Sequence, residues 1–243
     1  MTRILIINGG HQFAHSPGLF NKTLLNEDVN YFNSLDEYEI KTTQVDEAYD
    51  TLEEVEKLKW ADVIIYHTPV WWFQIPFKFK EYLDKVLTEG HQKGIYHSDG
   101  RTRKNPAINY GTGGQLHGRK YLVTTSWNAP KEAFEWKGEF FDQTSVDKGV
   151  LFGFHKMNQF IGLEHLDSLH FHDMEKNADV PKELSRYKSF LNHHFKFLNN
   201  YFSEAKFEDR PVRRLHADRP TGRLLRVLLV VHITSSAELV HQQ

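Results

Sequence analysis

Three adjacent aromatic residues stand where a chain normally places polar turn residues. Trp71, Trp72 and Phe73 directly follow an apolar, strand-like run and lie between Pro69 and Pro76. Large rings in this position favour a flat partner, because offset stacking stabilises each ring pair by about 0.5–1.5 kcal/mol beyond the burial of area. The segment TPVWWFQIP therefore predicts a platform for an isoalloxazine or nicotinamide ring. A hydrophobic loop buried in a dimer interface is the alternative, and the two are compatible.

Two other segments offer polar groups at the ends of strand-like runs. The first, NGGHQFAHSPG, precedes a helix and supplies His15, backbone N–H groups and Ser16 as the expected N-cap. A helix N-terminus with free donors is a ready anion site, so a pyrophosphate could bind there. The second, TTSWNAP at 124–130, carries hydroxyl and amide groups that could hydrogen-bond the pyrimidine edge of a flavin. Each segment taken alone is also compatible with an ordinary turn.

These segments are positioned by an alternation of apolar strands and amphipathic helices. The expected strands are Arg3–Asn8, Tyr38–Val45, Asp62–His67, Lys120–Ser126 and Glu164–His172, and the expected helices cover 20–32, 52–58, 77–87, 152–160 and 184–201. The alternation predicts an α/β fold, a flavodoxin-like, doubly wound, five-stranded parallel sheet in three α/β/α layers. Because ligands bind beyond the carboxyl ends of such strands, we expect the three loops to converge.

A long polar segment, 88–118, interrupts this alternation and is rich in glycine. A structureless insertion of this length is uncommon in a compact domain and tends to be functional. We expect it either to cover a site or to reach a second subunit.

The composition excludes several classes of function. The chain has 243 residues, a formal net charge of −2 and no Cys, which argues against a nucleic-acid partner and rules out disulfides, thiolate metal sites and a Cys nucleophile. The longest apolar stretch, 224–233, has about half of the roughly 20 residues that a membrane helix needs. With no secretory signal visible behind Met1, we expect a cytoplasmic protein without a membrane span.

The fifteen histidines do not predict a metal site. His170 and His172 would share one face of a strand, but no third residue of metal-ligand spacing accompanies them. The neighbours His193 and His194 would point apart on a helix. We therefore expect no bound metal.

The composition changes near residue 206. Every Lys lies at or before Lys206, whereas six Arg residues follow it: Arg210, Arg213, Arg214, Arg219, Arg223 and Arg226. We divide the chain into a domain at 1–203 and an Arg-rich tail at 204–243. The tail is either a non-native, poorly ordered extension or a genuine basic arm, since clustered arginines attract phosphates.

Several motifs together resemble one known family. They include ILIINGG, FAHSPG, KWADVIIYHTPVWWFQIPFKFKEYLDKVLTEGH, SDGRTRK, YGTGGQLHGRKYLVTTSWNAPKEAF and FHKMNQFIG, and they cover residues 1 to about 202. The chain is similar to the modulator of drug activity B family, a branch of the flavodoxin-like NAD(P)H:quinone oxidoreductases. The resemblance implies a homodimer that binds FAD, prefers NADPH and reduces quinones such as menadione by two electrons.

The resemblance also assigns site residues. It implies that the FAD phosphates and ribityl chain are held by Ser16, Pro17, Gly18, Leu19, Phe20, Asn21, Lys22 and Thr23, beside His15. It places the isoalloxazine at Pro69, Val70, Trp71, Trp72 and Phe73, and its polar edge at Ser126, Trp127, Asn128 and Ala129. Tyr110 would complete the site, reaching it from the partner subunit. The chain departs from its relatives at Val70, Phe73, Ser126 and Pro17, and Pro17 removes one backbone donor from the phosphate loop.

The implied mechanism is ping-pong hydride transfer from NADPH through flavin N5 to a quinone, with both substrates using one stacked position. Trp72 and Tyr110 would act by stacking and positioning, and the proton donor stays open among Tyr110, His91 and His117. An azo- or nitro-reductase differs only in its acceptor. A flavodoxin-type electron carrier would need an acidic docking face, and a scaffold without cofactor would be colourless.

Overall fold

The computed structural model describes residues 1–14 and 16–196. His15, the 204–243 tail and the last turns of the expected 184–201 helix lie outside the described residues. Five parallel strands form one sheet in the order β2-β1-β3-β4-β5. The strands are β1 (Thr2–Asn8), β2 (Tyr38–Gln44), β3 (Val63–Pro69), β4 (Lys120–Ser126) and β5 (Glu164–Phe171). The expectation of a doubly wound, flavodoxin-like sheet is confirmed.

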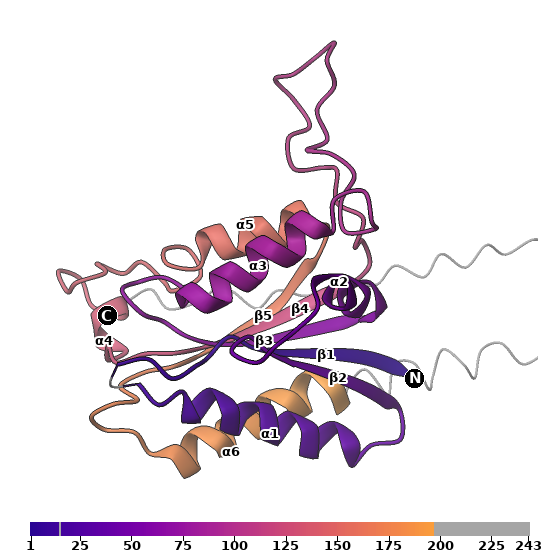
Figure 1. Ribbon diagram of the computed structural model, residues 1–243. Coiled ribbons are helices and arrows are strands. Elements are labelled where there is room, and N and C mark those ends of the chain that lie inside the picture. The colour runs from indigo at the N-terminus through magenta and orange to yellow at the C-terminus, as the bar shows by residue number, and fades with distance from the viewer. Residues whose placement is uncertain (15, 197–243) are drawn as a thin grey trace, which may run out of the picture. The chain divides into compact units, whose positions relative to one another are not determined.

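Helices cover both faces of this sheet, as Figure 1 shows. On one face lie α2 (Thr51–Trp60), α3 (Phe77–Glu89) and α5 (Phe152–Phe160), and on the other lie α1 (Leu19–Asn33) and α6 (Val180–Leu191). A four-residue helix that the sequence did not predict, α4 (Glu132–Glu135), follows β4. The result is the three-layer arrangement that the alternation of elements predicts.

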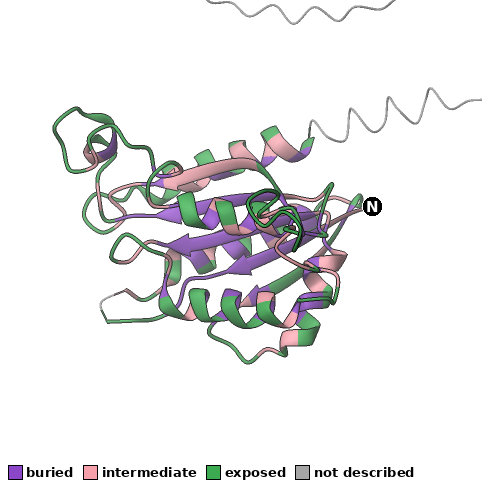
Figure 2. Ribbon diagram, turned by 90° about the horizontal axis from the view of Figure 1, so that it is seen from above, coloured by how far each residue is buried: buried purple, intermediate pink, exposed green. Residues whose placement is uncertain are grey.

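The central strands are buried on both faces, which is why they form continuous apolar runs rather than alternating ones. Every residue of β3 is buried, and the side chains of Ile4–Ile7 in β1 have no exposed area. Figure 2 shows the same strands buried beneath their helices. This rigid centre fixes the positions of the loops that follow β1, β3 and β4.

A buried polar network connects the sheet with α1 and α6. The His67 Nε2 atom lies 2.7 Å from an Asp28 carboxylate oxygen, and its Nδ1 atom lies 2.8 Å from the Thr124 hydroxyl. The Tyr187 hydroxyl donates to the other Asp28 oxygen. Because these groups are fully buried, each needs its partners to offset the loss of water. The network holds the carboxyl ends of β3 and β4 against α1.

The final helix is shorter than the apolar stripe predicts. α6 ends at Leu191, and Asn192–Lys196 form a π-helical turn in place of further α-helix. The stripe nevertheless packs as expected, since Tyr187, Leu191 and Phe195 are fully buried. The prediction of one continuous α-helix is therefore wrong after Leu191, where the helix becomes π-helical. The prediction of which face is buried is correct for the described residues.

The edge strand β5 contains a one-residue bulge. Tyr121 pairs with His165 and Leu122 pairs with Asp167, so Leu166 is an extra residue in the ladder. A bulge of this kind reverses the alternation of side chains beyond it. His165 therefore faces the same side as Ser168 and His170.

The segment between α3 and β4 has no helix or strand of its own and projects from the body beyond α3 (Figure 1). Backbone hydrogen bonds close its base, from Gln92 N–H to the Tyr96 carbonyl and from His97 N–H to the Gly113 carbonyl. Residues 101–110 are exposed throughout. Within the described ranges, no helix has the length and apolar character that crossing a membrane requires.

Candidate active site

The loop after β1 ends in a glycine that the fold requires. Gly18 is the N-cap of α1 with φ 68°, and a Cβ atom there would lie 2.9 Å from the backbone carbon of His11. Only glycine adopts this conformation without strain and also fits the space. Ser16, the expected N-cap, instead exchanges backbone hydrogen bonds with Phe13 across a tight turn. The prediction of Ser16 as the cap is therefore wrong.

The start of α1 leaves hydrogen-bonding groups for a ligand. Its first N–H groups, on Leu19, Phe20 and Asn21, precede the first hydrogen bond at this end, from Lys22 N–H to the Gly18 carbonyl. No acidic residue lies in this first turn. The Asn21 side chain is 2% exposed, and its Oδ1 atom has no hydrogen-bond partner among the described residues. Free N–H groups at a helix N-terminus attract anions.

The loop after β3 carries its aromatic residues on a strained turn. Trp71 and Gln74 exchange two backbone hydrogen bonds, and between them Trp72 has φ 48° and Phe73 has φ 62°. Positive φ at both central positions is typical of a type I′ turn, which normally takes Gly, Asn or Asp. The turn projects Trp72 into solvent with 91% of its area exposed. Strained residues of this kind cluster at functional sites.

Trp71 packs into an aromatic group below that turn. Its ring centroid lies 4.8 Å from that of His11 and 5.2 Å from that of Phe13, and both rings also contact Phe77. The two nitrogens of His11 have no hydrogen-bond partner in the described part of the chain, and burial lowers its pKa. A neutral His11 thus supports Trp71 as a packing residue.

The loop after β4 combines a polar edge with a buried indole. The Ser126 hydroxyl accepts a 3.4 Å hydrogen bond from the Asn21 amide. Trp127 is 4% exposed, donates from Nε1 to the Thr125 hydroxyl at 2.7 Å and packs edge-on against Phe134. The Trp127 indole is therefore a core side chain, although the residue borders the pocket described next.

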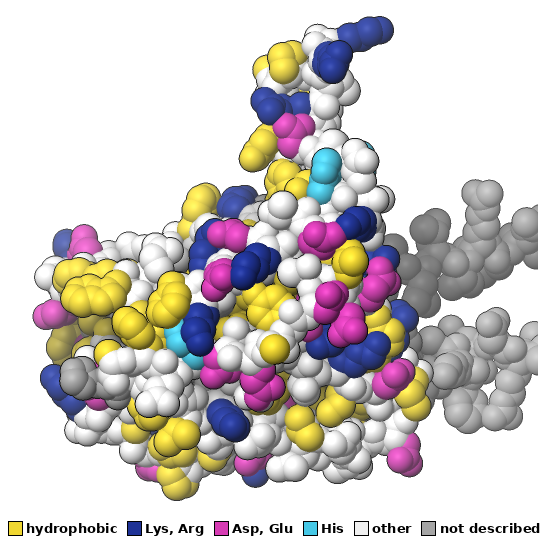
Figure 3. All heavy atoms as spheres, viewed as in Figure 1, with side chains coloured by type: hydrophobic (Ala, Val, Ile, Leu, Met, Phe, Trp, Pro, Cys, Tyr) yellow, Lys and Arg dark blue, Asp and Glu magenta, His cyan; other side chains and the backbone are white. Residues whose placement is uncertain are grey.

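The three loops converge on one pocket, as the parallel topology predicts. Its volume is about 550 Å³, within the range of small-molecule sites. The expected residues that line it are Ser16, Pro17, Gly18, Leu19, Phe20, Asn21, Pro69, Val70, Trp71, Trp72, Ser126, Trp127 and Asn128. Figure 3 shows hydrophobic side chains gathered at the end of the body where these loops lie, on the left of the view.

Some expected residues do not line this pocket within one chain: Lys22, Thr23, Phe73, Ala129 and Tyr110. Thr23 instead donates to the Leu19 carbonyl, and Phe73 stacks on Phe140 at 5.3 Å. Tyr110 is 70% exposed in the projecting segment, where its ring lies 5.8 Å from that of Phe160. His91 and His117 also do not line it; they follow α3 and precede β4.

Four lining residues were not predicted from the sequence: Phe13, Ala14, Met174 and Glu175. Phe13 and Ala14 belong to the same FAHSPG segment, so their position next to Ser16 was the available signal. Met174 and Glu175 follow β5, whose carboxyl end reaches the same edge of the sheet.

The fold brings an acidic side chain to one of the histidines, which the sequence spacing did not reveal. The His170 Nε2 atom lies 3.4 Å from Asp147, which also contacts His155. His194 pairs with Asp167 at 2.9 Å rather than with another histidine. The expectation of no bound metal stays a prediction.

The residues of the pocket fit a ligand with an anionic part and a flat ring. The lining of the pocket includes Leu19, Phe20 and Asn21, whose backbone N–H groups begin α1, together with Trp71 and Trp72 of the aromatic turn. A flavin nucleotide combines these two features. The arrangement can therefore hold such a group by donors at its phosphate and by apolar contact at its ring.

Comparisons with known proteins agree with the fold. A family model described as "Flavodoxin-like fold" matches residues 2–193. An uncharacterized protein of Schizosaccharomyces pombe is 47% identical over 78% of this chain and 95% of its own length. The protein named NADPH:quinone oxidoreductase MdaB of Haemophilus influenzae is 42% identical over 77% of this chain and 96% of its own length.

Solved structures share the fold at lower identity. A putative quinone reductase from Klebsiella pneumoniae superposes with a TM-score of 0.62 and 19% identity, over 80% of this chain and 85% of the other. The general stress protein 14 of Treponema denticola, solved in complex with FMN, superposes with a TM-score of 0.55 and 20% identity, over 79% of this chain and 99% of the other. The resemblance drawn from the motifs is confirmed, and the chain belongs to the flavodoxin-like family that includes the MdaB protein.

Proposed function

We propose that this chain is a flavin-dependent NAD(P)H:quinone oxidoreductase that binds FAD and takes its electrons from NADPH. One observation carries the proposal: loops from β1, β3 and β4 line a single pocket that joins the free N-terminus of α1 to an exposed tryptophan turn. The name of the Haemophilus influenzae relative, 42% identical along nearly its whole length, supports the same activity.

Different residues of the pocket bind different parts of the flavin. The N–H groups of Leu19–Asn21 hold the phosphates, and the amide of Asn21 reaches the sugar chain. Val70, Trp71 and Trp72 cover the ring, and Ser126 and Asn128 face its polar edge. When bound, the flavin supplies a carrier that accepts a hydride at N5 and passes it on. The chain contributes binding and orientation, for which rigid strand-end loops are suited.

We further propose that the enzyme is a homodimer in which Tyr110 serves the partner's pocket. Tyr110 and Ile108 are 70% and 52% exposed in a segment that projects from its own subunit. Exposed apolar side chains on a projecting segment are typical of a subunit contact. The pocket is also open on the side of Trp72, which is 91% exposed. A second copy of the chain would cover such an opening.

Purification of the full chain tests the cofactor. We expect yellow protein whose denaturation releases a flavin, and the released flavin should be FAD rather than FMN by chromatography against both standards. In an anaerobic cuvette, NADPH should bleach the absorbance and menadione should restore it. Colourless protein that takes up neither FAD nor FMN would overturn the proposal.

The acceptor is tested by steady-state kinetics with menadione and an azo dye in the same preparation. Parallel lines in double-reciprocal plots are expected for ping-pong exchange in one pocket. A higher kcat/KM for the azo dye would reassign the chain to azo reduction while leaving the flavin site in place.

A further inference from the structure

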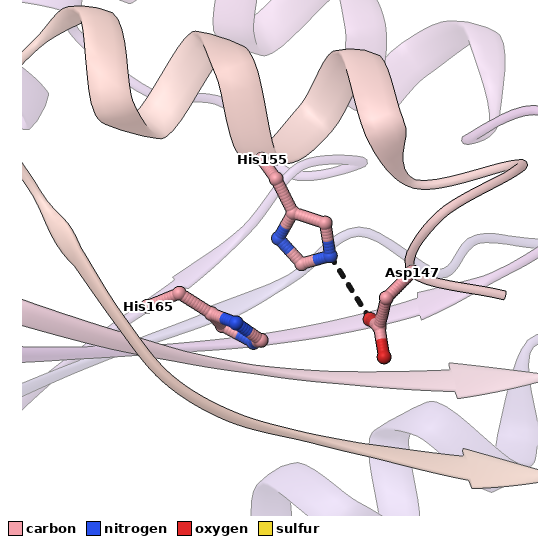
Figure 4. A group of neighbouring side chains, drawn as sticks. All are labelled: Asp147, His155 and His165. Atoms are coloured by element: carbon pink, nitrogen blue, oxygen red, sulfur yellow. Dashed lines mark hydrogen bonds and ion pairs between the residues drawn. The ribbon is translucent and has the colours of Figure 1, made fainter. Parts of the chain in front are cut away.

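A cluster of imidazole and carboxylate groups lies at the outer edge of the sheet, on residues that the pocket does not use. Asp147, His155 and His165 each present one ligand atom, and these atoms lie within 4.8 Å of one another (Figure 4). The His155 Nε2 atom is 2.9 Å from the Asp147 carboxylate, and the two imidazole rings are 4.4 Å apart. The three side chains come from the loop before α5, from α5 and from the start of β5.

The bulge in β5 adds a fourth group to this cluster. Because Leu166 is the extra residue, His165 and His170 face the same side although they are an odd number of positions apart. The His170 Nε2 atom lies 3.4 Å from the Asp147 carboxylate. Asp147 thus lies between histidines from α5 and β5.

Hydrogen bonds to their Nδ1 atoms orient the imidazole rings of His155 and His170. The Nδ1 atom of His155 lies 2.6 Å from the Tyr121 hydroxyl, and the Nδ1 atom of His170 lies 2.7 Å from the Thr125 hydroxyl. An oxygen partner on the other ring nitrogen is what metal-ligating histidines require, because it fixes the tautomer and the orientation of the ring. The Nε2 atoms of His155 and His170 both point to the same carboxylate.

We propose that Asp147, His155 and His165 bind a divalent transition-metal ion of the Zn²⁺ class, with His170 held beside Asp147. Imidazole nitrogens and a carboxylate oxygen are suitable ligands for Zn²⁺, at distances of about 2.0–2.2 Å. Closing the cluster around one ion needs side-chain movements of roughly 1 Å, which the half-exposed Asp147 and the exposed His165 can make. His155 then carries its proton on Nδ1 and donates it to the Tyr121 oxygen.

The ion would join the edge strand to α5 and to the loop that precedes it. Such a link stabilises the folded chain by mass action, since the ligands are assembled only in the native state. The proposal does not depend on the flavin, because none of its residues lines the pocket after β1, β3 and β4.

The test uses the full chain as purified, dialysed against a chelator and titrated with Zn²⁺, or with Co²⁺ for its visible absorption. We expect one ion per chain and tetrahedral Co²⁺ bands. With Zn²⁺ at 100 times its Kd, the midpoint of thermal unfolding should rise by about 5–10 °C. Asp147→Asn and His165→Gln should each weaken binding by at least about 100-fold and remove the rise in Tm.

The matched control is His97→Gln, which removes an exposed histidine of the projecting segment. It should bind Zn²⁺ with the affinity of the unchanged chain. Binding within threefold of that affinity in both Asp147→Asn and His165→Gln would place the ion elsewhere and overturn the proposal. Absence of saturable binding below about 1 mM in the unchanged chain would overturn it as well.

Discussion

Replacement of Trp72 separates flavin binding from folding. Its side chain is 91% exposed and therefore contributes little packing within its own subunit. If a bound ring covers one indole face, about half of the roughly 200 Å² of a tryptophan, burial contributes about 2.5 kcal/mol. Stacking adds about 0.5–1.5 kcal/mol. Allowing for the ordering of the indole, we expect a loss of about 3 kcal/mol, or roughly 100-fold in Kd.

The most informative substitution is Trp72→Gly. Since Trp72 has φ 48°, glycine relieves backbone strain at this position, and the free energy of unfolding should not fall. Trp72→Ala should lose the same affinity for flavin, but alanine does not relieve the backbone strain at positive φ. Flavin titration of the apoprotein by fluorescence gives the Kd, and urea unfolding of the same apoprotein gives the stability.

Trp136→Ala provides the control, because Trp136 is also exposed, at 60%, but does not line the pocket. Its flavin Kd should match that of the unchanged protein. The reasoning is refuted if Trp72→Gly binds flavin within threefold of the unchanged protein, or if Trp136→Ala loses affinity to the same extent.

Three further substitutions test the supports of the site. Gly18→Ala should destabilise the protein by about 1–3 kcal/mol in urea unfolding and weaken flavin binding, because it combines φ 68° with a contact to the His11 backbone. Asp28→Ala should cost about 3–5 kcal/mol in the same assay, since it leaves His67 and Tyr187 buried without their partner. His11→Phe should reduce the fall in stability at low pH: the folded-state pKa of His11 is lowered by burial, so the unfolded chain binds the extra proton and stability falls as pH drops below about 6.5. Equal slopes of stability against pH from 7 to 5 in the two proteins would contradict this last assignment.

The sheet could be predicted from the sequence because its strands are buried runs with clear ends. β4 and α5 have the bounds that the pattern predicts, Lys120–Ser126 and Phe152–Phe160. The start of α1 was mispredicted for a physical reason. Ser16 has the side chain of an N-cap, but its backbone is engaged by Phe13, and the left-handed Gly18 takes the position instead. The sequence pattern therefore predicted the helix correctly but not its N-cap residue.

The pocket could be predicted in outline because parallel topology brings the carboxyl ends of strands to one edge. That Met174 and Glu175 line the pocket could not be predicted, because the composition of the loop after β5 is not unusual. The role of Tyr110 depends on a second chain and stays a prediction. The Asp147 cluster was missed because Asp147 and His170 are 23 positions apart in the sequence. In addition, only the bulge in β5 puts His165 and His170 on the same side of the strand.

That bulge makes the edge strand respond differently to the loss and to the gain of a single residue. Removing Leu166 would delete the extra residue and leave Asp167–Phe171 paired with Leu122–Ser126 on their present faces. A one-residue insertion that the bulge did not absorb would instead exchange the two faces of everything that follows. Phe171, now fully buried against Tyr187 and Phe20, would then turn towards α5, and His170 would enter an apolar core without its Asp147 partner. Deletion of Leu166 should therefore be tolerated better than an insertion after it, and related chains that lack the extra residue should keep the same buried face.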